Sequence, residues 1–143
     1  MFNGVFGRAG GTRLLNQQLI HRLIRNDKIN KTGKLFVVVG RYTVSAGMML
    51  ASEIERNTDA IFVGEPTGSS PNFVGQDVGI RLPYSGMQGS HSDLYWQNSS
   101  ATDFRVWIPP LLYTPPSFVL YSSNRDPALE AILDYGPIQA SPK

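Results

Sequence analysis

The chain has 143 residues, the size of one domain with a single hydrophobic core, and its 41% hydrophobic and 17% charged residues indicate a globular protein. The formal net charge of +2 comes from 13 basic and 11 acidic residues that form no basic face with interleaved aromatics, so we expect no nucleic-acid partner. The lack of cysteine excludes disulfides, thiolate catalysis and sulfur-ligated metals.

The first predicted element is a helix preceded by a glycine-rich turn at residues 7–11, with Thr12 placed to cap it. Its apolar residues recur at helical spacing and form one stripe: Leu15, Leu19, Ile20, Leu23 and Ile24. The polar run at residues 26–33 ends this helix. Residues 34–40 then predict a buried strand, because this run is short, β-branched and bounded by glycines.

The central segment predicts a βαβ unit. A bend at residues 40–44 leads to Ser45 and to a second helix, whose apolar side consists of Met48, Leu50, Ala51 and Ile54. Residues 60–64 predict a second buried strand. Two strands joined by a helix at this spacing predict parallel pairing with a right-handed crossover.

The second half of the chain has a different character. Alternating apolar residues at 78, 80 and 82, followed by turn-forming residues, predict a hairpin. Residues 96–116 are rich in aromatics and prolines and predict an irregular, packed segment. Residues 126–133 predict a short helix with Asp126 at its N-cap and Pro127 at its first position. We therefore expect one α/β domain over residues 1–143, with a βαβ core and an irregular, β-rich C-terminal half.

Ser45 is the most informative candidate for chemistry, because it stands between the end of a predicted strand and the start of a helix. Free N–H groups and the helix dipole at such a position favour developing negative charge. This suits a nucleophile whose attack generates an oxyanion, with the Ala46 N–H as a donor. The simpler interpretation is that Ser45 only caps its helix, and spacing alone favours it. Residues 43–47 also lack the glycines of a nucleophile elbow.

Residues 34–75 resemble the tail-specific (C-terminal-processing) peptidase family in the order of their parts. These parts are a strand, a bend, the pair Ser45-Ala46, a helix, a strand and the motif Gly64-Glu65-Pro66-Thr67-Gly68. The resemblance continues more loosely to residue 130 and therefore covers nearly the whole chain. It implies the C-terminal part of a peptidase catalytic domain with a ClpP/crotonase-like fold, in the tricorn/retinoid-binding-like branch.

This resemblance implies a serine-type endopeptidase that cleaves peptide or protein substrates through an acyl-enzyme at Ser45, without a cofactor. The oxyanion hole would combine the Ala46 N–H with an N–H of Gly10 or Gly11. A compartment is not encoded in residues 1–5, which lack the pattern of a secretory signal. The family implies a bacterial periplasmic or extracellular setting.

The general base is the main departure from the family. Members with a serine–lysine dyad carry the lysine where Ser70 stands here, and a serine cannot replace it. The tricorn/retinoid-binding-like branch uses an upstream histidine and a downstream acid, so we expect a base outside this chain and Asp103 in the acid's position. The simpler interpretation of Asp103 is a surface carboxylate paired with Arg105. His91 is the weaker candidate for a replacement base, and His21 is expected to face solvent.

Two further functions remain open at this point. One is a catalytically inactive fragment, or a relative of the same fold that binds peptides or hydrophobic ligands. Ser70, which stands in place of the family's lysine, favours this inactive relative. Residues 4–8 favour it too, because they depart from the family's apolar-Asp-Leu-Arg strand. The other is an acyl-CoA-handling enzyme of the crotonase type, which would form no covalent serine adduct.

The expected partners follow from the same residues. The aromatic residues Tyr95, Trp96, Trp107 and Tyr113 either line a peptide groove or belong to the core.

We expect no metal site, since histidines and acids lack metal-binding spacing. We also expect no membrane span, because the longest apolar run is only residues 35–39. Apolar surface left uncovered in an incomplete domain predicts self-association.

Overall fold

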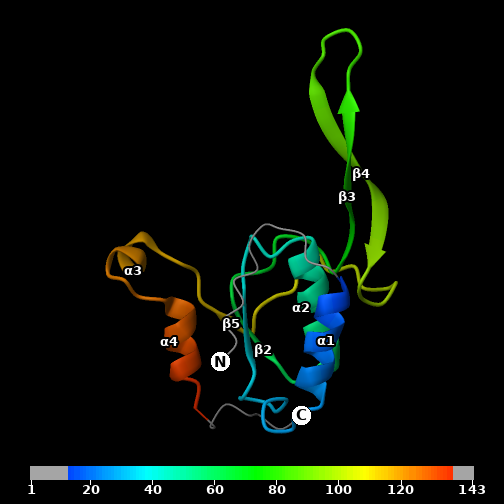
Figure 1. Cartoon of the computed structure of the whole chain (residues 1–143). Coiled ribbons are helices and arrows are strands. Elements are labelled where there is room, and N and C mark those ends of the chain that lie inside the picture. The colour runs from blue at the N-terminus through cyan, green and yellow to red at the C-terminus, as the bar shows by residue number, and fades with distance from the viewer. Residues whose placement is uncertain (1–12, 137–143) are drawn as a thin grey trace.

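A computed structural model describes residues 13–136, with side chains described from residue 16 onward (Figure 1). The glycine turn at residues 7–11 and its cap Thr12 lie outside the described residues. The described chain runs in the order α1, β1, α2, β2, β3, β4, β5, α3 and α4. Figure 1 shows a body built from the helices and the β1–β2–β5 sheet, from which the β3–β4 hairpin projects.

The predicted βαβ unit is confirmed. Strands β1 (Phe36–Val39) and β2 (Ile61–Gly64) pair in parallel and are joined through helix α2 (Ala46–Asn57). Strand β5 (Leu112–Tyr113) adds to the other edge of β2, also in parallel, giving the order β1-β2-β5. The sequence predicts irregular structure at residues 112–113, and this prediction is wrong, because a two-residue strand among prolines shows no alternating pattern.

The parallel sheet is buried on both faces, as its continuous apolar strands predict. Alternate residues of β1 point to opposite sides. Val37 and Val39 join Phe62 in a cluster with α1 (Arg13–Ile24) and α2 that also holds Ile20, Leu23, Leu35, Met48, Leu50, Ala51, Ile54 and Ile108. On the other face, Ile61 and Val63 pack with Ala128 of α4 (Pro127–Leu133). Each fully buried apolar side chain of this size contributes about 1.5–3 kcal/mol.

The helix predictions hold with two differences. Ile20 and Leu23 of the α1 stripe are buried, while Ile24 at the end of the helix is 39% exposed. The predicted cap of α4 is confirmed, since Asp126 Oδ1 accepts hydrogen bonds from two N–H groups of its first turn. Helix α3 (Phe118–Ser122) was not predicted, because five residues are too few to show helical periodicity.

The predicted hairpin is confirmed and is longer than its apolar alternation indicated. Strand β3 (Asn72–Arg81) pairs antiparallel with β4 (Gln88–Gln97), and the pairing is interrupted at Gln76, whose φ is 66°. Val78 and Ile80 remain 38% and 48% exposed, so the alternation reflects a strand without a covered face. Most of the β structure of the second half lies in this hairpin. No helix within residues 13–136 has the length and apolarity to cross a membrane.

Candidate active site

Ser45 lies in the bend between β1 and α2 in a conformation that non-glycine residues rarely adopt. Its φ is 52° and its ψ is −123°. Holding a serine there costs about 1–3 kcal/mol, and such strain gathers at functional sites. Ser45 occupies the N-cap position of α2, yet its side chain makes no capping hydrogen bond. The capping interpretation, which spacing favoured, therefore does not account for this residue. A strained serine on a strand-to-helix turn is the local geometry of a nucleophile elbow.

The bend is held by hydrogen bonds of Thr43, which is buried. Thr43 Oγ1 accepts from the Gly40 N–H at 3.1 Å, and the Thr43 N–H donates to Gly40 O at 2.8 Å. Thr43 O in turn accepts from the Gly68 N–H at 3.1 Å. These bonds fix the backbone just before Ser45, which helps to keep Ser45 in its strained conformation.

The two glycines of the Gly-Glu-Pro-Thr-Gly motif allow the β2 exit loop to press against this bend. Gly64 has a φ of 116°, and a Cβ there would lie 2.2 Å from Val39 O. A Cβ on Gly68 would lie 2.0 Å from Arg41 O. Either side chain would force the loop and the bend apart. Residues 64–68, here called the brace, therefore support the segment that carries Ser45.

Two residues of the brace bind neighbouring segments: Thr67 binds Ile108, and Glu65 binds Arg41. Thr67 is buried, its N–H donates to Ile108 O at 3.2 Å, and its Oγ1 accepts from the Ile108 N–H at 2.8 Å. Glu65 Oε1 lies 2.9 Å from Arg41 Nη2. The Thr67 hydroxyl is thus engaged in structural hydrogen bonds within this loop.

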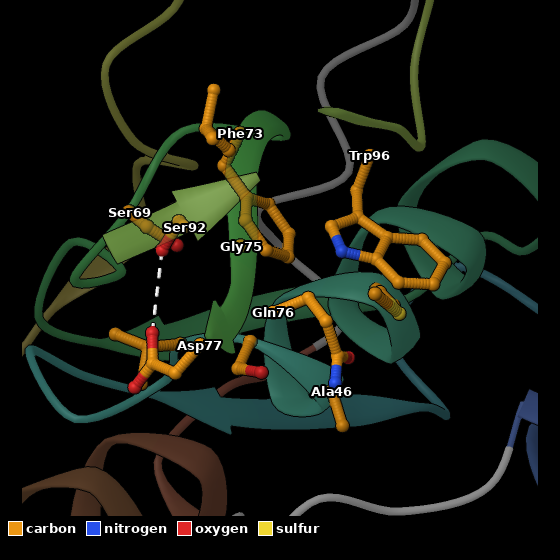
Figure 2. Close-up of a pocket in the computed structure, with 12 residues that line it drawn as sticks. Ala46, Ser69, Phe73, Gly75, Gln76, Asp77, Ser92 and Trp96 are labelled. Carbon is orange, nitrogen blue, oxygen red and sulfur yellow. Dashed lines mark hydrogen bonds between the residues drawn. The ribbon is translucent and has the colours of Figure 1, made fainter. Parts of the chain in front are cut away.

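Ser45 opens into a pocket of about 690 Å³ between the body and the base of the hairpin (Figure 2). The bend and α2 contribute one wall, the loop after the brace contributes Ser69, and the hairpin contributes the other wall. The lining residues are Val44, Ser45, Ala46, Met49, Ser69, Phe73, Val74, Gly75, Gln76, Asp77, Ser92 and Trp96.

Two polar groups at this pocket are unpaired within the described residues. The N–H groups of Gly47 and Met48 donate to Val44 O, but no described residue accepts a hydrogen bond from the Ala46 N–H. Ser69 Oγ is buried and has no hydrogen-bond partner among residues 13–136. A free N–H directly after the candidate nucleophile is what an oxyanion hole requires.

The hairpin wall is apolar near the body. Phe73 and Trp96 form a cross-strand pair, and both rings lie against Gly75. A Cβ on Gly75 would lie 2.8 Å from Phe73 Cε2 and 3.2 Å from Trp96 Cδ1, so glycine makes room for the rings. Trp96 therefore lines the pocket. Trp107 and Tyr113 are 49% and 64% exposed and belong neither to the core nor to this pocket.

Asp103 does not reach the Ser45 pocket. Its two carboxylate oxygens accept hydrogen bonds from Arg105 Nε at 2.9 Å and Nη2 at 2.7 Å. Arg105 also binds both carboxylate oxygens of Glu55 on α2. The hydrogen bonds from Arg105 hold the pKa of Asp103 well below its usual range. The surface-pair interpretation of Asp103 is confirmed.

The other candidates for the general base are also placed away from Ser45. His91 is exposed on β4 and is not among the residues that line the pocket. His21 is exposed on α1, as predicted. Ser70 Oγ donates to Asn72 O at 2.5 Å and so supports the base of the hairpin. Gly10 and Gly11 lie outside the described residues.

Sequence reasoning identified Ser45, Ala46 and Trp96 but missed Ser69 and Asp77. Asp77 is the single ionisable side chain among the described lining residues. No signal in the sequence marked it, because its place depends on how the hairpin rises beside α2. Within residues 13–136 no three potential metal ligands gather.

No protein-family model matches the chain, and no curated protein matches it.

Proposed function

We propose that this chain is part of a serine peptidase of the tail-specific type, with a ClpP/crotonase-like βαβ core and Ser45 as its nucleophile. The observation that supports this most is the conformation of Ser45, with a φ of 52° and no capping bond. A serine that only capped α2 would adopt ordinary extended geometry and use its hydroxyl on the helix N–H groups. Instead the hydroxyl is left for other chemistry at the edge of a pocket.

The proposed reaction is acyl transfer. Ser45 Oγ attacks a peptide carbonyl carbon while a general base takes its proton, and the Ala46 N–H donates to the oxyanion. The C–N bond then breaks, the amine leaves with the proton, and an ester joins the acyl group to Ser45. Water hydrolyses this ester. We assign the base to a group outside the described residues, and a second oxyanion N–H to Gly10 or Gly11.

Labelling by a fluorophosphonate tests this function by intact mass. Because the base is assigned elsewhere, added imidazole should act as a substitute base and raise the labelling rate with its concentration. We expect one adduct, mapping to Ser45, which is lost in Ser45→Ala and kept in Ser69→Ala. Ser69 is the matched control, since it lines the same pocket. A folded chain without an adduct on Ser45 at any imidazole concentration would contradict the proposal.

A second candidate is a non-catalytic relative that binds peptides. It is favoured by the lack of histidine and lysine among the described residues that line the pocket. This candidate predicts peptide binding without a fluorophosphonate adduct, so the same experiment separates the two functions. The crotonase-type alternative likewise predicts no adduct, but it requires binding of an acyl-CoA rather than a peptide.

A further inference from the structure

The hairpin wall of the pocket has two chemically different ends. The pair Phe73–Trp96 lies toward the body, and the pair Asp77–Ser92 lies farther along the same two strands. Residues 73 and 77 are four apart on β3, which separates them by about 13 Å along the strand. On β3, Gly75 lies between them and carries no side chain. The wall therefore offers an apolar surface at one end and a carboxylate at the other.

The carboxylate of Asp77 is available to a ligand. It is exposed, and Ser92 Oγ donates a hydrogen bond to Asp77 Oδ1 at 3.3 Å (Figure 2). No described Lys or Arg forms a salt bridge with Asp77, whereas Asp103 and Glu65 are both paired with arginines. A carboxylate that lacks a cation and faces a pocket attracts a positively charged ligand group.

We propose that Asp77 determines substrate specificity by selecting peptides with a Lys or Arg side chain near an apolar one. The apolar side chain packs against Phe73 and Trp96, and the cation pairs with Asp77. In an extended peptide of about 3.3 Å per residue, a long basic side chain spans this gap from a position two or four residues away. The inference rests on the proposed function, because it concerns the substrate of that same pocket.

Binding to the Ser45→Ala chain tests the inference without turnover. The probes are acetylated and amidated peptides with one Phe and, two or four residues from it, Lys, norleucine or Glu. Norleucine matches the length of Lys without its charge. We expect the Lys peptide to bind about fivefold more tightly than the norleucine peptide and the Glu peptide to bind most weakly. The preference for Lys should shrink as salt is added.

Asp77→Asn should bind the Lys and norleucine peptides equally. The matched control is Asp93→Asn, which removes the same charge from the facing strand at a residue that does not line the pocket. It should keep the Lys preference. Equal binding of all three peptides to the parent, no binding of any peptide, or a Lys preference that survives in Asp77→Asn would each overturn the inference.

The two proposals fail separately. Fluorophosphonate labelling of Ser45 reports the reaction without any peptide, and peptide binding reports Asp77 without any reaction. A Ser45 adduct without a charge preference would support the peptidase and contradict the role of Asp77. A charge preference that depends on Asp77, in a chain whose Ser45 is never labelled, would keep Asp77 as the residue that selects bound peptides and would contradict the peptidase.

Discussion

At the scale of single residues, the conformation of Ser45 lowers the stability of the fold. With φ at 52° and ψ at −123°, the Cβ of Ser45 is crowded by its own backbone. Glycine adopts such a conformation freely, because it has no Cβ. Any non-glycine residue at position 45 should therefore store strain that glycine would release, and the native serine places its hydroxyl at the pocket.

The first prediction compares Ser45→Gly with Ser45→Ala. Ser45→Gly should be more stable than Ser45→Ala by about 1 kcal/mol, or a few degrees in Tm, because glycine removes the strain and alanine keeps it. Neither variant should be labelled by a fluorophosphonate. Thermal unfolding of both variants, followed by circular dichroism, measures the difference. If Ser45→Gly were the less stable variant, position 45 would be unstrained and the main support for the peptidase would be lost.

The residues of the site differ in how far the sequence could identify them. Ser45 and Ala46 could be identified from the sequence, because a strand followed by a helix fixes which N–H groups are free. Spacing alone favoured the capping interpretation, and the backbone angles of Ser45 and its lack of a capping hydrogen bond then argued against it. Ser69 and Asp77 could not be identified from the sequence, because they reach the pocket on a loop and a hairpin whose directions depend on tertiary contacts.

At the scale of elements, the bend and the brace form one unit. The Gly68 N–H donates to Thr43 O, and the absence of a Cβ on Gly68 lets the brace touch Arg41 O. The strain at Ser45 is maintained only while this contact keeps the bend in place. A change in the brace should therefore affect stability and the reactivity of Ser45 together.

The second prediction concerns Gly68→Ala. A Cβ at 2.0 Å from Arg41 O must displace backbone, so we expect a loss of about 2 kcal/mol or more in unfolding free energy. Labelling of Ser45 should slow in the fraction that remains folded. Gly79→Ala is the control, because a Cβ there meets nothing within 4 Å. Urea unfolding gives the free energies, and equal stability of the two variants would show that the brace does not hold the bend.

The elements that could be predicted are those with a clear hydrophobic period. β1, α2 and β2 each place apolar residues where burial requires them, so their type and order followed from the sequence. β5 and α3 are too short to carry a period. The hairpin was predicted from alternation and turn residues, but its length was not, because exposed strands carry no burial signal.

At the scale of the whole molecule, the pocket depends on how the hairpin is anchored to the body. Asn72 Oδ1 accepts from the N–H groups of Asn98 and Ser99, and its Nδ2 donates to Ser100 O at 2.7 Å. Phe73, the next residue, packs against the main core cluster. These contacts fix the base of the hairpin, while its far end is exposed. The wall that carries Phe73 and Trp96 should therefore be the better ordered part of the hairpin.

Ion pairs of Arg105 link the segment after the hairpin to α2 and should make the stability of the fold depend on pH. Arg105 joins Asp103 to Glu55 on α2, and its hydrogen bonds lower the pKa of Asp103. Because the folded pKa lies below the unfolded value of about 3.9, the pair stabilises the fold above about pH 4. This stabilisation is lost as the pH falls through the folded pKa.

The third prediction is that Asp103→Asn flattens this acid dependence. The variant should lose about 1 kcal/mol at neutral pH, where the charged pair is intact, and progressively less as the pH is lowered toward 2. Urea unfolding at several pH values measures it. Glu130→Gln is the control: hydrogen bonds from Arg125 also lower the pKa of Glu130, but its side chain is 38% exposed against 10% for Asp103. Solvent screens the exposed pair, so Glu130→Gln should change the pH profile less. A parent-like profile for Asp103→Asn would mean that the hydrogen bonds between Arg105 and Asp103 add no net stability.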